Sequence, residues 1–225
     1  MTGKSLVWDL PTRLFHWTLT LSLVGSWVSA EVGYEWMAWH IRLGYVALTL
    51  ILFRLVWGFI GPHHARFSSF MRWPWHALRE LPELMSTQTS NRAGHSHLGG
   101  WSIAVMLALV GIQAGSGLFI TDDIFYAGPY NPAVSSDTAG TLAQVHRINF
   151  QLLQAMVSLH ILIIVWYRWR KHTNLLAPML SGLKSIDAAD AIPSSKLLAG
   201  LAIAGLCAGG VALLVYLAPE PVYLF

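Results

Sequence analysis

The sequence predicts an all-α integral membrane protein, a four-helix transmembrane bundle followed by a fifth transmembrane helix. Of its 225 residues, 55% are hydrophobic and 11% are charged, whereas a soluble globular domain carries about 25% charged residues. The apolar residues gather in five runs, and each comes near the length of about 17–25 residues with which a helix spans the hydrocarbon core. The five runs are 14–30, 40–60, 99–120, 147–167 and 197–217. No stretch remains for a separate soluble domain.

The first apolar run has one competing interpretation. Small residues end it at 28–30 (VSA) after a basic start, which is also typical of a cleaved signal peptide. His16, Trp17 and Trp27 lie inside the run and favour a retained helix.

The distribution of basic residues predicts the orientation of the helices. Lysines and arginines lie before the first run, between the second and third, and between the fourth and fifth: Lys4, Arg13, Arg66, Arg72, Arg79, Arg92, Arg168, Arg170, Lys171, Lys184 and Lys196. The predicted loops 31–39 and 121–145 contain none. The positive-inside rule therefore places the N-terminus in the cytoplasm and the C-terminus outside. The pI near 9.2 follows from this orientation and does not indicate nucleic-acid binding.

Four histidines lie in or beside the predicted membrane helices. His146 and His160 are fourteen residues apart in one run, which corresponds to about 21 Å along a helix and about 40° of rotation. His16 and His40 lie at the opening ends of two other runs. With the predicted orientation, His40 and His146 share the outer level, and His16 and His160 share the cytoplasmic level. A histidine within a membrane needs a partner, so this arrangement predicts two metal centres.

The cofactor that suits such paired imidazoles is b-type haem. The sequence contains a single cysteine and no Cys-x-x-Cys-His, which excludes covalently attached c-type haem. Two imidazoles on one iron leave no open position, so each haem would transfer electrons instead of binding oxygen. One alternative is a set of interfacial histidines bonded to carbonyls. Another is a transporter that binds protons or a metal ion, although no Asp or Glu lies within the predicted helical cores.

Further residues near the histidines suit a haem. Arg54 follows His40 by fourteen residues and therefore shares its helix face at the inner level, where a guanidinium can grip haem propionates. Arg42 and Arg147 adjoin the outer ligands, and both could instead snorkel to the interface. Gly44, one turn from His40, would let a flat macrocycle lie against the helix. In contrast, the segment 95–97 (HSH) is predicted to be a solvated loop.

Several segments resemble the bacterial cytochrome b561 superfamily, specifically its Ni/Fe-hydrogenase-type cytochrome b branch. The resemblance spans about residues 6–184. It rests on the spacing of His146 and His160 and on the segments 8–17 (WDLPTRLFHW), 40–45 (HIRLGY), 53–62 (FRLVWGFIGP), 94–101 (GHSHLGGW) and 115–119 (GSGLF).

The resemblance implies a di-haem four-helix membrane domain, which we assign to residues 1–184. Residues 185–225, a polar linker and the fifth apolar run, lie beyond this shared core. The resemblance also implies two b haems, ligated by His16 with His160 and by His40 with His146, in a bacterial inner membrane with the C-terminus periplasmic. Electrons would pass between membrane quinone and an extracytoplasmic redox partner, such as a c-type cytochrome or an oxidoreductase subunit. The acidic loop 121–145 would suit a positively charged partner. The alternative is a stand-alone oxidoreductase that acts on superoxide or ferric iron, with Arg42 and Arg147 beside the outer haem. The fold by itself does not choose between these functions.

Overall fold

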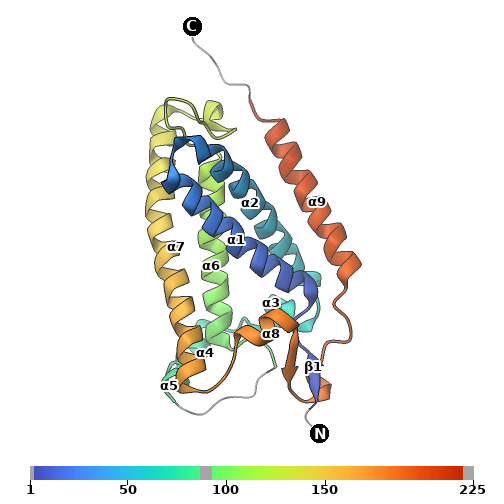
Figure 1. Ribbon diagram of the computed structural model, residues 1–225. Helices are drawn as coiled ribbons and strands as arrows, with labels where there is room; N and C mark the ends of the chain where they lie inside the picture. Colours follow the sequence, from blue (N-terminus) through green and yellow to red (C-terminus); the bar gives the residue numbers. More distant parts are fainter. Residues whose placement is uncertain (1–2, 87–92, 220–225) are drawn as a thin grey trace. The chain divides into compact units, whose positions relative to one another are not determined.

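The computed structural model describes residues 3–86 and 93–219, so Arg92 of the basic loop lies outside the described residues. The long helices are α1 (Leu10–Val32), α2 (Met37–Ile60), α6 (His97–Gly117), α7 (Ser136–Arg170) and α9 (Leu197–Tyr216) (Figure 1). The short elements are β1 (Lys4–Leu6), α3 (Phe67–Phe70), α4 (Pro74–Arg79), α5 (Leu81–Met85), α8 (Leu176–Ser181) and β2 (Leu183–Ser185), with 3-10 turns at Tyr34–Trp36, His63–Ala65, Asn131–Ala133 and Ala188–Asp190.

Within the described residues, four helical segments are long and apolar enough to cross a membrane. They are Tyr34–Ile60, His97–Gly117, Ser136–Arg170 and Leu197–Tyr216. The chain is therefore a multi-pass membrane protein. Helix α1 is 23 residues long but is not one of these four segments, so its passage through the membrane stays a prediction.

Helix α7 begins earlier than the apolar run predicted. It starts at Ser136 and not near residue 147, so the prediction of a loop over all of 121–145 was wrong. The Ser135 hydroxyl accepts a hydrogen bond from the Thr138 backbone N–H at 3.3 Å and so caps the first turn. A helix of 35 residues is about 52 Å long, which exceeds the hydrocarbon thickness of about 30 Å. Apolar patterning detects only the part of such a helix that lies in lipid.

The chain divides into two compact units. The unit that holds His16, called the His16 unit, comprises Met1–His16, Arg54–Met106 and Ala155–Ile203. The unit that holds His40, called the His40 unit, comprises Trp17–Phe53, Leu107–Gln154 and Ala204–Phe225. The predicted boundary between residues 184 and 185 stays a prediction.

The His16 unit contains a small sheet that the sequence did not indicate. β1 and β2 pair antiparallel, with Lys4 opposite Ser185 and Leu6 opposite Leu183, next to α8 (Figure 1). Ile186 is 1% exposed and packs with Val7 in a buried cluster. The segment 185–196 is therefore partly ordered against the start of the chain, because its isoleucines are apolar enough to be buried.

Asp9 anchors the start of α1. One of its carboxylate oxygens accepts hydrogen bonds from the Thr12 backbone N–H at 2.8 Å and from Trp57 Nε1 at 3.0 Å. The other oxygen accepts a hydrogen bond from the Thr12 hydroxyl at 2.8 Å. Asp9 is 1% exposed and Trp57 is fully buried. This carboxylate is an N-cap that also joins α1 to α2.

Replacement of Asp9 by alanine is expected to destabilise the protein by about 2–4 kcal/mol, because the helix loses its cap and the buried Trp57 N–H loses its acceptor. Thermal unfolding in detergent measures the effect. Asp137→Ala, which removes an exposed carboxylate from the first turn of α7, is the matched control. Equal unfolding midpoints for the two variants would contradict the anchoring role.

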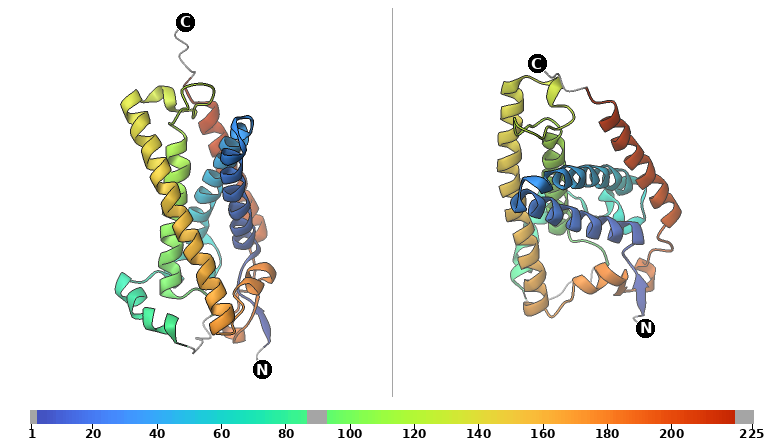
Figure 2. Two further views of the ribbon diagram at one scale, coloured as in Figure 1. Left: turned by 60° about the vertical axis from the view of Figure 1, so that its left-hand side comes forward. Right: turned by 45° about the horizontal axis from the view of Figure 1, so that its top comes forward.

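In the His40 unit, α6 and α7 lie side by side (Figure 2). Asn149 is 4% exposed, and its side-chain amide donates to the Leu109 carbonyl at 2.8 Å and to Gln113 Oε1 at 2.7 Å. Partnered polar groups of this kind join helices inside a membrane. They hold α6 against the part of α7 that carries His146.

Candidate cofactor-binding site

The structure brings His40 of α2 and His146 of α7 together in the His40 unit. Their ring centroids are 6.2 Å apart and their planes are inclined by 63°. Both side chains are half-buried. We call this pair the His40 site.

Each ring of the His40 site already uses its Nδ1 atom. His40 Nδ1 donates to the backbone carbonyl of Ser26 at 2.9 Å. His146 Nδ1 lies 3.0 Å from the Ser116 hydroxyl, which itself donates to the Ile112 carbonyl at 2.7 Å and so accepts from the histidine. Both Nδ1 atoms therefore carry the proton, and each Nε2 keeps a lone pair for a metal.

The spacing of the two rings suits one metal ion between them. A bond of about 2 Å from an imidazole nitrogen to a metal, made on both sides of the ion, places the ring centres about 6 Å apart. The described residues contain no group of three or more His, Cys, Asp or Glu side chains that could hold a bare ion. Two imidazoles alone suit a group that brings its own equatorial ligands, as a porphyrin does.

Ser26 and Ser116 were not among the site residues predicted from the sequence. Ser116 lies between two glycines near the end of α6. Its hydroxyl group, in a largely apolar helix, could have indicated a role in the site. The carbonyl of Ser26 had no such signal, because any residue supplies a carbonyl. Such outer partners fix the tautomer and the orientation of a ligating histidine.

Replacement of Ser116 by alanine is expected to weaken haem binding at the His40 site about 10–100-fold, the usual effect of losing a histidine's outer partner. Haem retained per chain, measured during titration of haem-depleted protein in detergent, reports the change. Ser22→Ala is the matched control, because the Ser22 hydroxyl is also buried and bonds only to the Thr18 carbonyl of its own helix. Equal haem affinity in both variants would show that Ser116 does not support the ligand.

Space is available beside the His40 site. A Cβ atom added at Gly44 of α2 would meet no atom within 4 Å, and the same holds at Gly115 of α6. A Cβ atom at Gly117 would lie 3.4 Å from Cε1 of His146. An open space next to Gly44 would suit a flat group, and the role of Gly44 stays a prediction.

Arg42 and Arg147 are both exposed. The Arg42 guanidinium lies over the Trp39 ring, 5.2 Å from its centroid. Arg147 lines a groove of about 730 Å³ between α1 and α7, together with Glu31 and Gln151. Their assignment to haem propionates stays a prediction.

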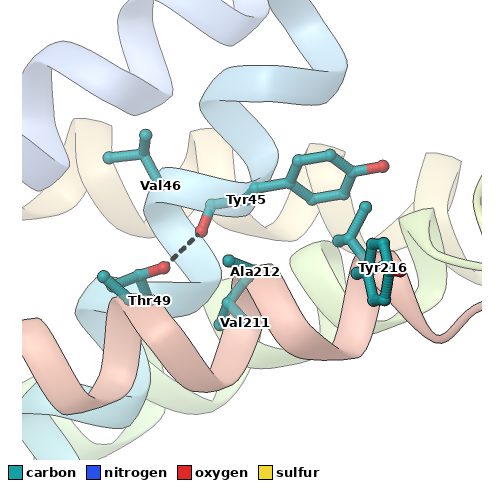
Figure 3. A pocket seen from close by; sticks show the side chains of 8 residues that line it. Tyr45, Val46, Thr49, Val211, Ala212 and Tyr216 are labelled. Atoms are coloured by element: carbon teal, nitrogen blue, oxygen red, sulfur yellow. Dashed lines mark hydrogen bonds between the residues drawn. The ribbon is translucent and has the colours of Figure 1, made fainter.

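A second groove, of about 480 Å³, lies between α2 and α9 in the His40 unit (Figure 3). Its walls are mostly aliphatic, with Tyr45 and Tyr216 at one end and Thr49 along it. The Thr49 hydroxyl donates to the Tyr45 carbonyl at 2.9 Å. No predicted ligand lines this groove.

The structure also brings His16 of α1 and His160 of α7 together, in the His16 unit. Both are half-buried, and they lie close enough for their charges to interact. Arg54 belongs to the same unit. It is 3% exposed, its guanidinium lies 4.9 Å from the centroid of the Phe67 ring, and its Nη1 has no hydrogen-bond partner among the described residues. We call the two histidines with Arg54 the His16 site.

The prediction of a solvated loop at 95–97 was wrong. The His95 ring packs against Trp8 at 4.4 Å and Phe70 at 5.1 Å between centroids, and His97 Nδ1 donates to the Phe70 carbonyl at 3.0 Å. Burial and, to a smaller extent, the charge of Arg54 lower the pKa of His95 to about 3, so the ring is neutral at physiological pH. Residues distant in sequence bury this segment, and local polarity gave no sign of them.

Comparison with protein families gives one match. A family model described as prokaryotic cytochrome b561 matches residues 7–182, which is more than half of the chain. Among curated proteins and among solved structures, nothing matches. The matched residues include all four histidines of the His40 and His16 sites.

Proposed function

Since the chain belongs to the prokaryotic cytochrome b561 family, whose members are membrane b-type cytochromes of electron transfer, we propose that it is a di-haem cytochrome. In this proposal it transfers electrons between membrane quinone and an extracytoplasmic redox partner. We also propose that it belongs to the Ni/Fe-hydrogenase-type branch of the family. The main observation in support of this function is the His40–His146 pair. Its ring centroids are 6.2 Å apart, and both Nδ1 atoms are hydrogen-bonded to other residues.

The residues of this chain would hold two haems in two different units. His40 and His146 would ligate one iron, with Gly44 leaving room for the macrocycle. His16 and His160 would ligate the other, with Arg54 next to its carboxylates. Helix α7 supplies one ligand to each pair, fourteen residues apart.

Bound haem supplies reversible one-electron chemistry at an iron whose axial positions are both filled by imidazole. The protein sets the orientation of the imidazoles through the Ser26 carbonyl and the Ser116 hydroxyl. Such control of the ligands tunes a haem's redox potential.

The location of the partner follows from topology. The positive-inside rule places the His40 site, together with the segment 121–135, at the periplasmic face of a bacterial inner membrane. Asp122 in this segment accepts backbone hydrogen bonds from Tyr126, Ile124 and Phe125 at 2.8–3.0 Å. These bonds lower the pKa of Asp122, so its charge persists. A basic c-type cytochrome suits this acidic surface.

Electron transfer from a short-chain quinol to a basic c-type cytochrome, catalysed by the purified protein, tests the function. The rate is expected to fall about tenfold or more from low to physiological ionic strength, because electrostatic steering is screened. The double variant Asp123→Asn with Asp137→Asn is expected to lower the rate at low salt. Asp187→Asn with Asp190→Asn makes the same charge change in the His16 unit and is the control.

The outcomes separate the candidate functions. A rate that does not respond to salt would count against a basic partner at this surface. Haems that quinol cannot reduce would overturn the quinone assignment. Rapid oxidation of the reduced protein by superoxide or ferric iron, without any partner protein, would favour the stand-alone oxidoreductase.

A further inference from the structure

Among the buried nitrogen atoms of the His16 unit that have no hydrogen-bond partner within the described residues are Arg54 Nη1 and His95 Nδ1. A buried polar atom without a partner destabilises the folded state, and the effect is larger when the group is charged. Such atoms are rare in native proteins and call for an explanation.

The two side chains belong to one local environment. Phe70 packs against His95 at 5.1 Å and against Phe67 at 6.0 Å between ring centroids, and the Arg54 guanidinium lies 4.9 Å from the centroid of Phe67. His95, Arg54 and His160 all belong to the His16 unit. Aromatic rings form much of the surroundings, with Trp8 and Phe70 against His95 and Phe67 beneath the Arg54 guanidinium. These rings offer no acceptor of ordinary strength.

The nearby carboxylate of Asp9 is already engaged. Its two oxygens accept three hydrogen bonds, from the Thr12 N–H, the Thr12 hydroxyl and Trp57 Nε1. The environment of Arg54 and His95 therefore combines a buried positive charge with a second nitrogen that can donate. A carboxylate brought in by a ligand would satisfy both groups, since hydrogen bonds between charged donors and carboxylates are strong.

We propose that His95, through its Nδ1–H, joins Arg54 in binding a carboxylate of the haem held by His16 and His160. This inference rests on the proposed function, because it needs a haem at the His16 site. His95 is then a cofactor-binding residue without being an iron ligand. The paired donors also orient the macrocycle, since the carboxylates of a haem leave one edge of the ring.

The test measures the redox potential of each haem in purified His95→Phe protein, by spectroscopic titration. Phenylalanine keeps the ring that packs against Trp8 and Phe70 but cannot donate. Both haems are expected to remain bound. The redox potential of one of them, the haem that is lost in His160→Ala protein, is expected to fall. The reason is that a carboxylate with one donor fewer places more negative charge near the iron, which favours the ferric state. His95→Asn, whose amide donates from nearly the same place as Nδ1, is expected to recover part of the shift.

His64→Phe is the matched control, because His64 also adjoins Trp8 but its Nε2 already bonds to the Asp190 carbonyl at 2.7 Å. Its haem potentials are expected to match those of the wild type. Unchanged potentials in His95→Phe, or a shift of the other haem alone, would overturn the inference. Loss of a haem with the spectrum of altered axial ligation would also overturn it, because His95 would then be an iron ligand. A wild-type protein that binds no haem would instead overturn the proposed function itself.

Discussion

Purified wild-type protein is expected to contain two b haems per chain, and each ligand histidine is expected to control one of them. His40→Ala and His146→Ala should lose the same haem, and His16→Ala and His160→Ala should lose the other. A bis-histidine iron that loses one axial imidazole keeps a single protein bond, and the cavity left by alanine cannot replace it. The effect should be close to complete loss of one haem per variant.

The pyridine haemochrome assay gives the stoichiometry, and reduced-minus-oxidised spectra identify which haem remains. His63→Ala is the control, because His63 is exposed and belongs to neither site. Variants that lose haems in a different pairing would contradict the sites described above. A colourless wild-type protein would revive a transporter that binds protons or a metal ion.

Replacement of Gly44 by leucine is expected to abolish haem binding at the His40 site while leaving the fold intact. A Cβ atom added at Gly44 meets no atom within 4 Å, so the first atom of a new side chain does not clash. Leucine also favours a helix over glycine by up to about 1 kcal/mol, so α2 should not be weakened. The side chain would occupy the place that the macrocycle needs.

Haem stoichiometry and the unfolding midpoint of the haem-depleted protein together measure this effect. Gly209→Leu in α9 is the matched control, since a Cβ atom there also meets no atom within 4 Å and no predicted ligand lies on α9. Full retention of both haems in Gly44→Leu would show that the macrocycle does not lie against this residue. Equal loss of haem in Gly44→Leu and Gly209→Leu would point to a general effect of the added leucine.

The sequence by itself was sufficient to predict the long helices and to select the four histidines as candidate ligands. Long apolar runs are sufficient to predict membrane helices, because no backbone group can stay unpaired in hydrocarbon and helices pair their groups internally. The fourteen-residue spacing in α7 and the basic loops then predicted which histidines share a level, and the structure brings the same histidines together. The family, with its membrane b-type cytochromes, was also evident from the motifs of residues 8–17 and 40–62, and the match to residues 7–182 confirmed it.

Only the tertiary structure decided what surrounds those histidines. The hydrogen bonds that the histidines donate to Ser26 and Ser116, the packing of His95 between Trp8 and Phe70, and the pairing of β1 with β2 all join segments distant in sequence. Local composition predicted a solvated loop at 95–97, where the rings are packed, and a loop up to residue 145, where α7 already begins at Ser136. The physical reason is that hydropathy reports how a segment partitions between lipid and water. The partner of a polar atom depends on which other segment folding places next to it.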